Sequence, residues 1–147
     1  MTFNDFDSFC LDASIFVKLL TPEDDSEQVS RFFIGIRQKA VVSPEFSKIE
    51  IVATLRKKYY LNQITKGQLA DAVGLFKRID VNYINNNWDV IEESLKIAND
   101  LSLTTIYDCI YLSIAKETSS AFITADIKFL EKAKTIYKHA YRVEDFL

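Results

Sequence analysis

The chain of 147 residues is long enough for one domain with one hydrophobic core, and its hydrophobic fraction of 48% excludes a disordered protein. Three glycines and two prolines leave no room for a flexible linker, so we expect a single domain over residues 1–147 with short connections. A formal net charge of −3 excludes nucleic-acid binding by a basic surface alone, so a nucleic-acid ligand would need bound cations.

The first part of the chain alternates between short apolar strands and helices. Residues 9–12 form a predicted strand that ends in an acid, and Ser14 is expected to cap a helix over 15–20. A second helix is expected over 25–37 and a second strand over 40–42. Both strands are apolar enough to be buried in a sheet.

A long helix is expected to follow the second strand. Ser43, Pro44 and Glu45 have the order of an N-terminal cap, a first-turn proline and a first-turn acid, so this helix should start here and run to about residue 60. Four residues at helical spacing are expected to form its inward-facing stripe: Phe46, Ile49, Val52 and Ala53.

The second half of the chain continues the alternation. Thr65 and Gln68 have the form of a capping box, which predicts a helix to about residue 78, and residues 81–84 alternate as in an edge strand. A helix over 87–100 is predicted by five residues at helical spacing: Trp88, Ile91, Leu95, Ala98 and Ser102. Further helices are predicted over 106–116 and 127–134. Further strands are predicted over 121–124 and 140–143.

Short apolar strands that alternate with amphipathic helices predict an α/β fold with a mostly parallel sheet. In such a sheet the carboxyl ends of the strands line one crevice, where ligands bind. Asp12 and Asp126 follow predicted strands, and Asp108 opens the helix that leads into the strand before Asp126. Acids gathered in one crevice repel one another unless a cation offsets their charge, so this cluster implies a divalent metal.

Each acid also has a simpler interpretation. Asp12 is an ordinary end-of-strand residue, Asp126 an N-cap, and Asp108 stands three residues after Thr105 in a capping arrangement. Glu50 is different, because it lies in an apolar stretch, where a carboxylate needs a partner or sits at the border of the buried stripe. No single acid is diagnostic.

The rest of the composition excludes most other hydrolytic chemistry. His139 is the only histidine, so the two-histidine chemistry of metal-free ribonucleases is impossible. The glycines fit no phosphate-binding loop, and Cys10 and Cys109 lie in apolar patterns typical of buried thiols. Neither a signal peptide nor a membrane-spanning stretch is found, so we expect a cytoplasmic protein that uses carboxylates and Mg²⁺ or Mn²⁺.

Four segments of the chain resemble the PIN-domain nucleases, specifically the VapC-type toxins. They occur in the family's order, and each carries one of its acids: residues 11–20, 49–55, 107–115 and 123–130. The resemblance extends from Leu11 to Phe146, and its specificity lies in the order of the four motifs. The sequence departs from the family at Cys109, where alanine is usual, and between residues 61 and 88, where no motif matches.

The resemblance implies a three-layer α/β/α fold around a five-stranded parallel sheet, and a metal-dependent endoribonuclease that acts as the toxin of a toxin–antitoxin pair. RNA is the implied substrate, a cognate antitoxin the implied inhibitor, and a homodimer the implied assembly. By resemblance, Asp12 and Asp108 would be the direct ligands of Mg²⁺ or Mn²⁺. Glu50 and Asp126 would complete the acidic site, and Ser14 and Thr124 would supply supporting hydroxyls.

Other functions remain open. The chain could be a PIN nuclease of RNA processing outside any toxin–antitoxin pair, or a non-catalytic PIN-like module that binds RNA or protein. A retained cluster of repelling acids argues against the second. A phosphatase of the haloacid-dehalogenase type, with Asp12 as nucleophile, would want an aspartate two residues later, where Ser14 stands.

Basic and aromatic residues near Glu50 have two interpretations: Lys48, Arg56, Lys57, Lys58, Tyr59 and Tyr60. They form either a phosphate track with stacking rings or a solvated helix end whose cations favour the helix dipole, and we favour the second. Tyr107 either faces substrate or fills the core.

Overall fold

The computed structural model describes all 147 residues, Met1 to Leu147. Five strands form one sheet in the order β3-β2-β1-β4-β5, and every neighbouring pair is parallel. The strands are β1 (Ser8–Leu11), β2 (Ala40–Pro44), β3 (Asn82–Ile84), β4 (Ala121–Ile123) and β5 (Ala140–Tyr141). The prediction of an α/β fold with a parallel, five-stranded sheet is confirmed, and β3 is the edge strand that the alternation of residues 81–84 predicts.

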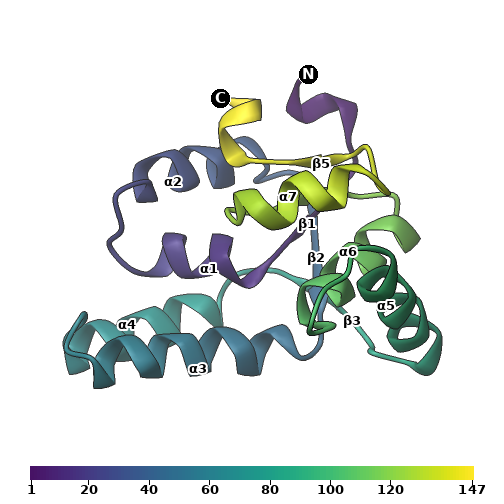
Figure 1. Cartoon of the computed structure of the whole chain (residues 1–147). Helices are drawn as coiled ribbons and strands as arrows, with labels where there is room; N and C mark the ends of the chain where they lie inside the picture. Colours follow the sequence, from purple (N-terminus) through teal and green to yellow (C-terminus); the bar gives the residue numbers. More distant parts are fainter.

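Helices connect the strands and cover the sheet. They are α1 (Ala13–Leu20), α2 (Ser26–Gly35), α3 (Ser47–Tyr60), α4 (Lys66–Phe76), α5 (Trp88–Asp100), α6 (Tyr107–Glu117) and α7 (Ile127–Lys134), with short 3-10 turns η1 (Phe3–Asp5) and η2 (Val143–Phe146). Figure 1 shows α1 to α4 on one side of the sheet and α5 and α6 on the other, while α7 packs along β5. None of these helices combines the length and the apolar character that a membrane crossing needs.

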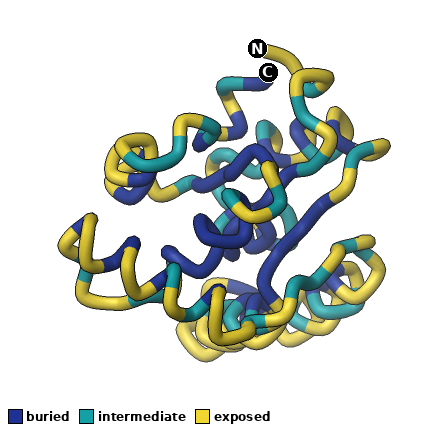
Figure 2. Tube along the Cα trace, turned by 90° about the vertical axis from the view of Figure 1, so that its right-hand side faces the viewer, coloured by how far each residue is buried: buried dark blue, intermediate teal, exposed yellow.

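The central strands lie in the hydrophobic core. Phe9 and Cys10 on β1 are completely buried, and Figure 2 shows the buried part of the trace running through the middle of the molecule. At one end of this core the rings of Phe3, Phe9 and Phe146 lie 5.3 to 6.3 Å apart, which ties both chain ends to the sheet. Cys10 and Cys109 are buried and unpaired, as predicted.

The start of α3 differs from the prediction. Ser43 and Pro44 belong to β2, and α3 begins at Ser47 without a side-chain cap. The hydroxyl of Ser43 donates to the carbonyl of Leu11 at 3.3 Å, and the amide of Glu45 donates to the carbonyl of Ile84 at 2.9 Å. Residues before proline favour extended backbone, so the proline prolongs the strand here instead of opening the helix.

The inward-facing side of α3 also differs from the prediction. The buried residues are Ser47, Ile51 and Leu55, whereas Ile49 is 77% exposed and Val52 is 39% exposed. The predicted stripe is therefore wrong, and α3 is turned so that Ile51 and Leu55 reach the core.

The other helix boundaries agree closely with the sequence. Thr65 and Gln68 form the expected capping box at the start of α4. Asn87 caps α5 by accepting a hydrogen bond from the amide of Val90 at 3.0 Å. Trp88 contributes to the helical spacing of α5 but is 75% exposed, so spacing alone does not identify its buried face.

Candidate active site

Two of the four acids follow neighbouring strands of the sheet. Asp12 comes directly after β1, and Asp126 comes shortly after β4, which pairs with β1. The amide of Asp12 donates to the carbonyl of Ile123 at 3.1 Å, so the pairing of the two strands continues up to the acid. The two connections therefore leave the sheet side by side, as the parallel topology predicts.

Two hydroxyl groups hold the carboxylate of Asp12. Ser14 donates to its Oδ1 and Thr124 donates to its Oδ2. Each hydroxyl also accepts from a backbone amide of the chain after β4: that of Ala125 for Ser14, at 3.2 Å, and that of Asp126 for Thr124, at 3.0 Å. Ser14 thus bridges two connections and does not cap α1, contrary to the prediction.

Asp12 is the most buried of the four acids, with 6% of its surface exposed. This burial raises the pKa of its carboxyl to about 6; the Ser14 and Thr124 hydroxyls oppose the increase, and the charge of Asp108 adds to it. The two hydrogen bonds fix the orientation of this carboxylate. Its burial makes ionisation costly unless a cation lies nearby.

Glu50 enters the site from the first turn of α3. Its Oε2 accepts a hydrogen bond of 2.8 Å from the hydroxyl of Tyr111, which lies on α6. Burial raises the pKa of Glu50, the Tyr111 hydrogen bond lowers it, and the charge of Asp108 raises it further. The expectation that this carboxylate has a partner at the border of the buried region is confirmed.

Asp108 is electrostatically linked to the other three acids. Its charge raises the pKa values of Asp12 and Glu50, and its own pKa is raised by burial and by the charge of Asp126. No hydrogen bond restrains its side chain, and Thr105 does not cap α6, so the capping interpretation of Asp108 is wrong.

Asp126 is a helix cap, as its simpler interpretation predicted. It is the N-cap of α7, and its Oδ1 accepts a hydrogen bond from the amide of Phe129 at 3.0 Å. This bond fixes the carboxylate at the start of α7, and its charge still acts on Asp108. Capping and membership of the acidic cluster are therefore compatible.

The donor set suits a hard divalent cation in its chemistry. The four acids and the two hydroxyls offer only oxygen, which such cations prefer, and burial together with the charges of neighbouring acids raises the pKa values of Asp12, Glu50 and Asp108. No group of three or more acidic, cysteine or histidine side chains stands in position to hold an ion directly. A cation shared by several of these acids therefore requires side-chain rotation or bridging water.

A comparison with protein-family models matches residues 9–135 to the PIN domain. The chain belongs to the PIN domain family. This confirms the resemblance that the four motifs carry, and it places all four acids inside the matched region. A comparison with curated proteins finds no match by sequence.

Solved structures share the fold of this PIN domain at low sequence identity. One such structure is VapBC2 from Rickettsia felis bound to a DNA fragment from the VapBC2 promoter. One of its chains has a TM-score of 0.68 and 13% sequence identity, and the match covers 92% of this chain and 98% of the VapBC2 chain. VapC20 of Mycobacterium tuberculosis, a sarcin-ricin loop cleaving toxin, has a TM-score of 0.58 at 12% identity over 78% and 85%. A toxin–antitoxin complex from Klebsiella pneumoniae gives 0.58 at 20% identity over 92% and 97%.

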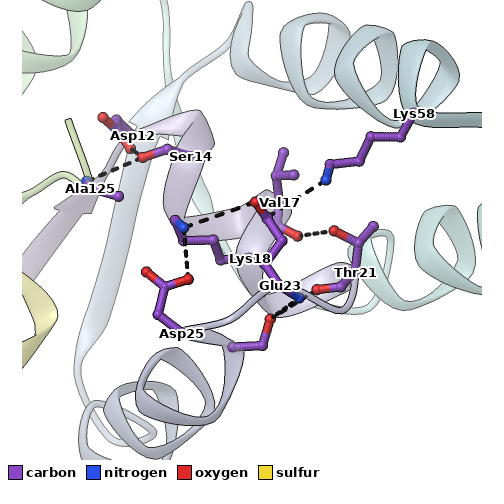
Figure 3. A network of polar contacts seen from close by, with 10 residues as sticks. Asp12, Ser14, Val17, Lys18, Thr21, Glu23, Asp25, Lys58 and Ala125 are labelled. Atoms are coloured by element: carbon purple, nitrogen blue, oxygen red, sulfur yellow. Dashed lines mark hydrogen bonds and ion pairs between the residues drawn. The ribbon is translucent and has the colours of Figure 1, made fainter. Parts of the chain in front are cut away.

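Sequence reasoning missed an ion-pair network that joins α1, the segment after it and α3 of this PIN domain. Lys18 on α1 pairs with Asp25 at 2.7 Å and Glu23 at 3.9 Å, and Glu23 also pairs with Lys58 on α3 at 3.8 Å (Figure 3). The network ties α1, which follows Asp12, to the helix that carries Glu50. Glu23 and Asp25, five and seven residues after Lys18, were the signal in the sequence, whereas Lys58 lies 35 residues after Glu23 and gave none.

Several basic residues of α3 have partners within the chain. Arg56 lies 5.6 Å from the ring centre of Tyr59 and 5.5 Å from that of Tyr60, and Lys58 belongs to the ion-pair network. Arg56, Lys57 and Tyr60 are exposed, which agrees with the solvated helix end that we favoured. Tyr107 is 59% exposed, so it does not fill the core.

Proposed function

We propose that this PIN domain is a metal-dependent endoribonuclease whose site consists of Asp12, Glu50, Asp108 and Asp126. The observation that carries the proposal is the electrostatic link from Asp108 to each of the other three acids. Capping of α7 accounts for Asp126, but no hydrogen bond or ion pair accounts for the place of Asp108 among the other carboxylates at the carboxyl edge of the sheet.

The chain's own residues would divide the work among them. Asp12, held by Ser14 and Thr124, and Asp108, which has no hydrogen bond, are the proposed direct ligands of Mg²⁺ or Mn²⁺. Glu50 and Asp126 complete the site, directly or through water. A cation bound there offsets the negative charge of the acids and stabilises the charge that develops on a phosphodiester during hydrolysis.

We further propose that the enzyme is the toxin of a toxin–antitoxin pair, a homodimer restrained by an antitoxin protein. Support comes from the solved structures with this fold, which include two toxin–antitoxin assemblies and a toxin that cleaves the sarcin-ricin loop. Large apolar side chains on the surface, such as Ile49 and Trp88, are exposed by 77% and 75% and suit protein contacts. A PIN nuclease of RNA processing is the alternative.

Cleavage of single-stranded RNA tests the enzymatic proposal. The purified chain is expected to cut RNA with Mn²⁺ or Mg²⁺ and to stop when the metal is chelated. Asp12→Asn and Asp108→Asn should each abolish cleavage while circular dichroism shows an unchanged fold. Asp71→Asn, which alters an exposed aspartate on α4, is the matched control and should remain active. Activity of Asp12→Asn equal to that of the parent would reject the site assignment.

Induced expression separates the toxin role from RNA processing. A toxin is expected to arrest growth, and co-expression of the neighbouring reading frame should restore it. Growth that continues while the enzyme accumulates in active form would favour the processing role.

A further inference from the structure

We infer that Tyr111 is a positioning residue that holds Glu50 in place for the divalent cation. The inference rests on the proposed function, because it assigns a role within the same acidic site. It concerns a side chain that contacts neither the cation nor the substrate in that proposal, and that acts only through Glu50.

The hydroxyl of Tyr111 is the one side-chain partner of the Glu50 carboxylate. The bond from this hydroxyl to Oε2 measures 2.8 Å and joins two elements that lie 61 residues apart in the sequence. An ordinary phenol is protonated at neutral pH, so the Tyr111 hydroxyl is the donor and the carboxylate the acceptor of this bond. The second oxygen of Glu50 has no such bond and is available to a ligand.

Tyr111 itself has little freedom to move. It is completely buried, and its ring meets that of Phe46 edge-on at a distance of 5.5 Å between ring centres. The thiol of Cys10 on β1 donates to its backbone carbonyl at 3.4 Å. A rigid donor fixes the flexible side chain that accepts from it, so the position of Glu50 is set by the core.

The place of Tyr111 on α6 matters as much as its contacts. Asp108 lies three residues earlier, so helical geometry places the two on the same face. One helix therefore supplies both an acid of the site and the hydroxyl that holds the acid arriving from α3. Asp12 and Asp126 have their own restraints from hydroxyls and a backbone amide, whereas Glu50 depends on Tyr111 alone.

Mn²⁺ binding, followed by electron paramagnetic resonance of the free ion, tests the inference without any measurement of cleavage. Tyr111→Phe keeps the buried ring and removes only the hydroxyl, and we expect it to weaken Mn²⁺ binding by about 10- to 100-fold, the usual effect of losing such an outer partner. Tyr137→Phe is the matched control. Its hydroxyl donates to the carbonyl of Ser120 at 2.7 Å, at the opposite end of β4 from the acids, so Mn²⁺ binding should not change.

A double-variant cycle establishes whether Tyr111 acts through Glu50. Glu50→Ala removes the group that the hydroxyl holds, so adding Tyr111→Phe should weaken Mn²⁺ binding no further. Effects that multiply would overturn the route through Glu50. If Tyr111→Phe binds Mn²⁺ as the parent does, the inference fails while the proposed function stands. A parent chain that binds no Mn²⁺ overturns both.

A measurement on the unaltered chain guards against a variant that fails to fold. In protein labelled with ¹³C at the phenolic carbon of tyrosine, Mg²⁺ should shift the resonance of Tyr111 and leave that of Tyr137 in place. An unchanged Tyr111 resonance at saturating Mg²⁺ contradicts the inference.

Discussion

At the scale of single residues, burial sets the charge of the site. Asp12 has 6% of its surface exposed, and its pKa is raised from 3.8 to about 6. Each pKa unit corresponds to about 1.4 kcal/mol, so at neutral pH the ionised carboxylate costs the folded chain about 3 kcal/mol. Strongly shifted pKa values are found mainly at functional sites, and binding a cation would offset the cost of ionising Asp12.

The metal-free chain should lose stability as the pH rises through the pKa of Asp12. A carboxyl whose pKa is higher in the folded state than in the unfolded state favours folding below the unfolded pKa, and this contribution disappears as the pH passes about 6. Asp12→Asn should therefore flatten the decline in the free energy of unfolding between about pH 4 and pH 6, measured by urea denaturation with chelator. Asp71→Asn should leave the decline intact, and equal profiles for Asp12→Asn and the parent would contradict this account.

The four acids could be proposed as site residues from the sequence, but the side chains that hold them could not. The four acids stand in short motifs whose order is visible along the chain, and Glu50 is conspicuous among apolar neighbours. The hydroxyl of Tyr111 reaches Glu50 only because α6 and α3 meet in three dimensions. Sequence spacing places Tyr111 on the face of Asp108, but it does not reveal what that face touches.

At the scale of elements, α3 shows why a helical pattern alone is ambiguous. Ile49 and Val52 have the spacing of one buried face, and Ile51 and Leu55 have the spacing of another. Packing against α1 and α4 selects the second face, and no local signal distinguishes the two. The strands were easier to predict, because short apolar runs between helices fit only the interior of a sheet.

Substitutions on the two faces of α3 should differ clearly in their effect on the free energy of unfolding. Ile51→Ala removes a completely buried side chain and should lower the free energy of unfolding by about 2–5 kcal/mol. Ile49→Ala changes a side chain that is 77% exposed and should alter it by no more than about 0.5 kcal/mol. Urea denaturation of both variants checks the orientation of the helix, and a larger effect at Ile49 would show that the helix is rotated.

At the scale of the whole molecule, the fold brings mutually repelling acids together from four places in the chain. Asp12, Glu50, Asp108 and Asp126 follow or begin different elements, and the parallel sheet directs those elements to one edge. Parallel topology could be predicted from the alternation of strands and helices. The strand order and the side-chain hydrogen bonds depend on long-range packing that the sequence pattern does not contain.

Divalent metal should stabilise the whole chain, because it offsets repulsion that folding creates. At a concentration one hundred times the dissociation constant, a ligand of the folded state adds about 2.7 kcal/mol to the free energy of unfolding. We therefore expect millimolar Mg²⁺ or Mn²⁺ to raise the melting temperature of the parent and to have little effect on Asp108→Asn. A parent melting curve that does not move with metal would count against the account.

Anomalous diffraction from crystals saturated with Mn²⁺ tests the central claim most directly, since that claim is that the four acids share one cation. The account predicts a single strong peak between the carboxylates of Asp12 and Asp108, with Glu50 and Asp126 reaching it directly or through one water. Density elsewhere, or a peak that Glu50 or Asp108 cannot approach within the reach of a bridging water, would contradict it.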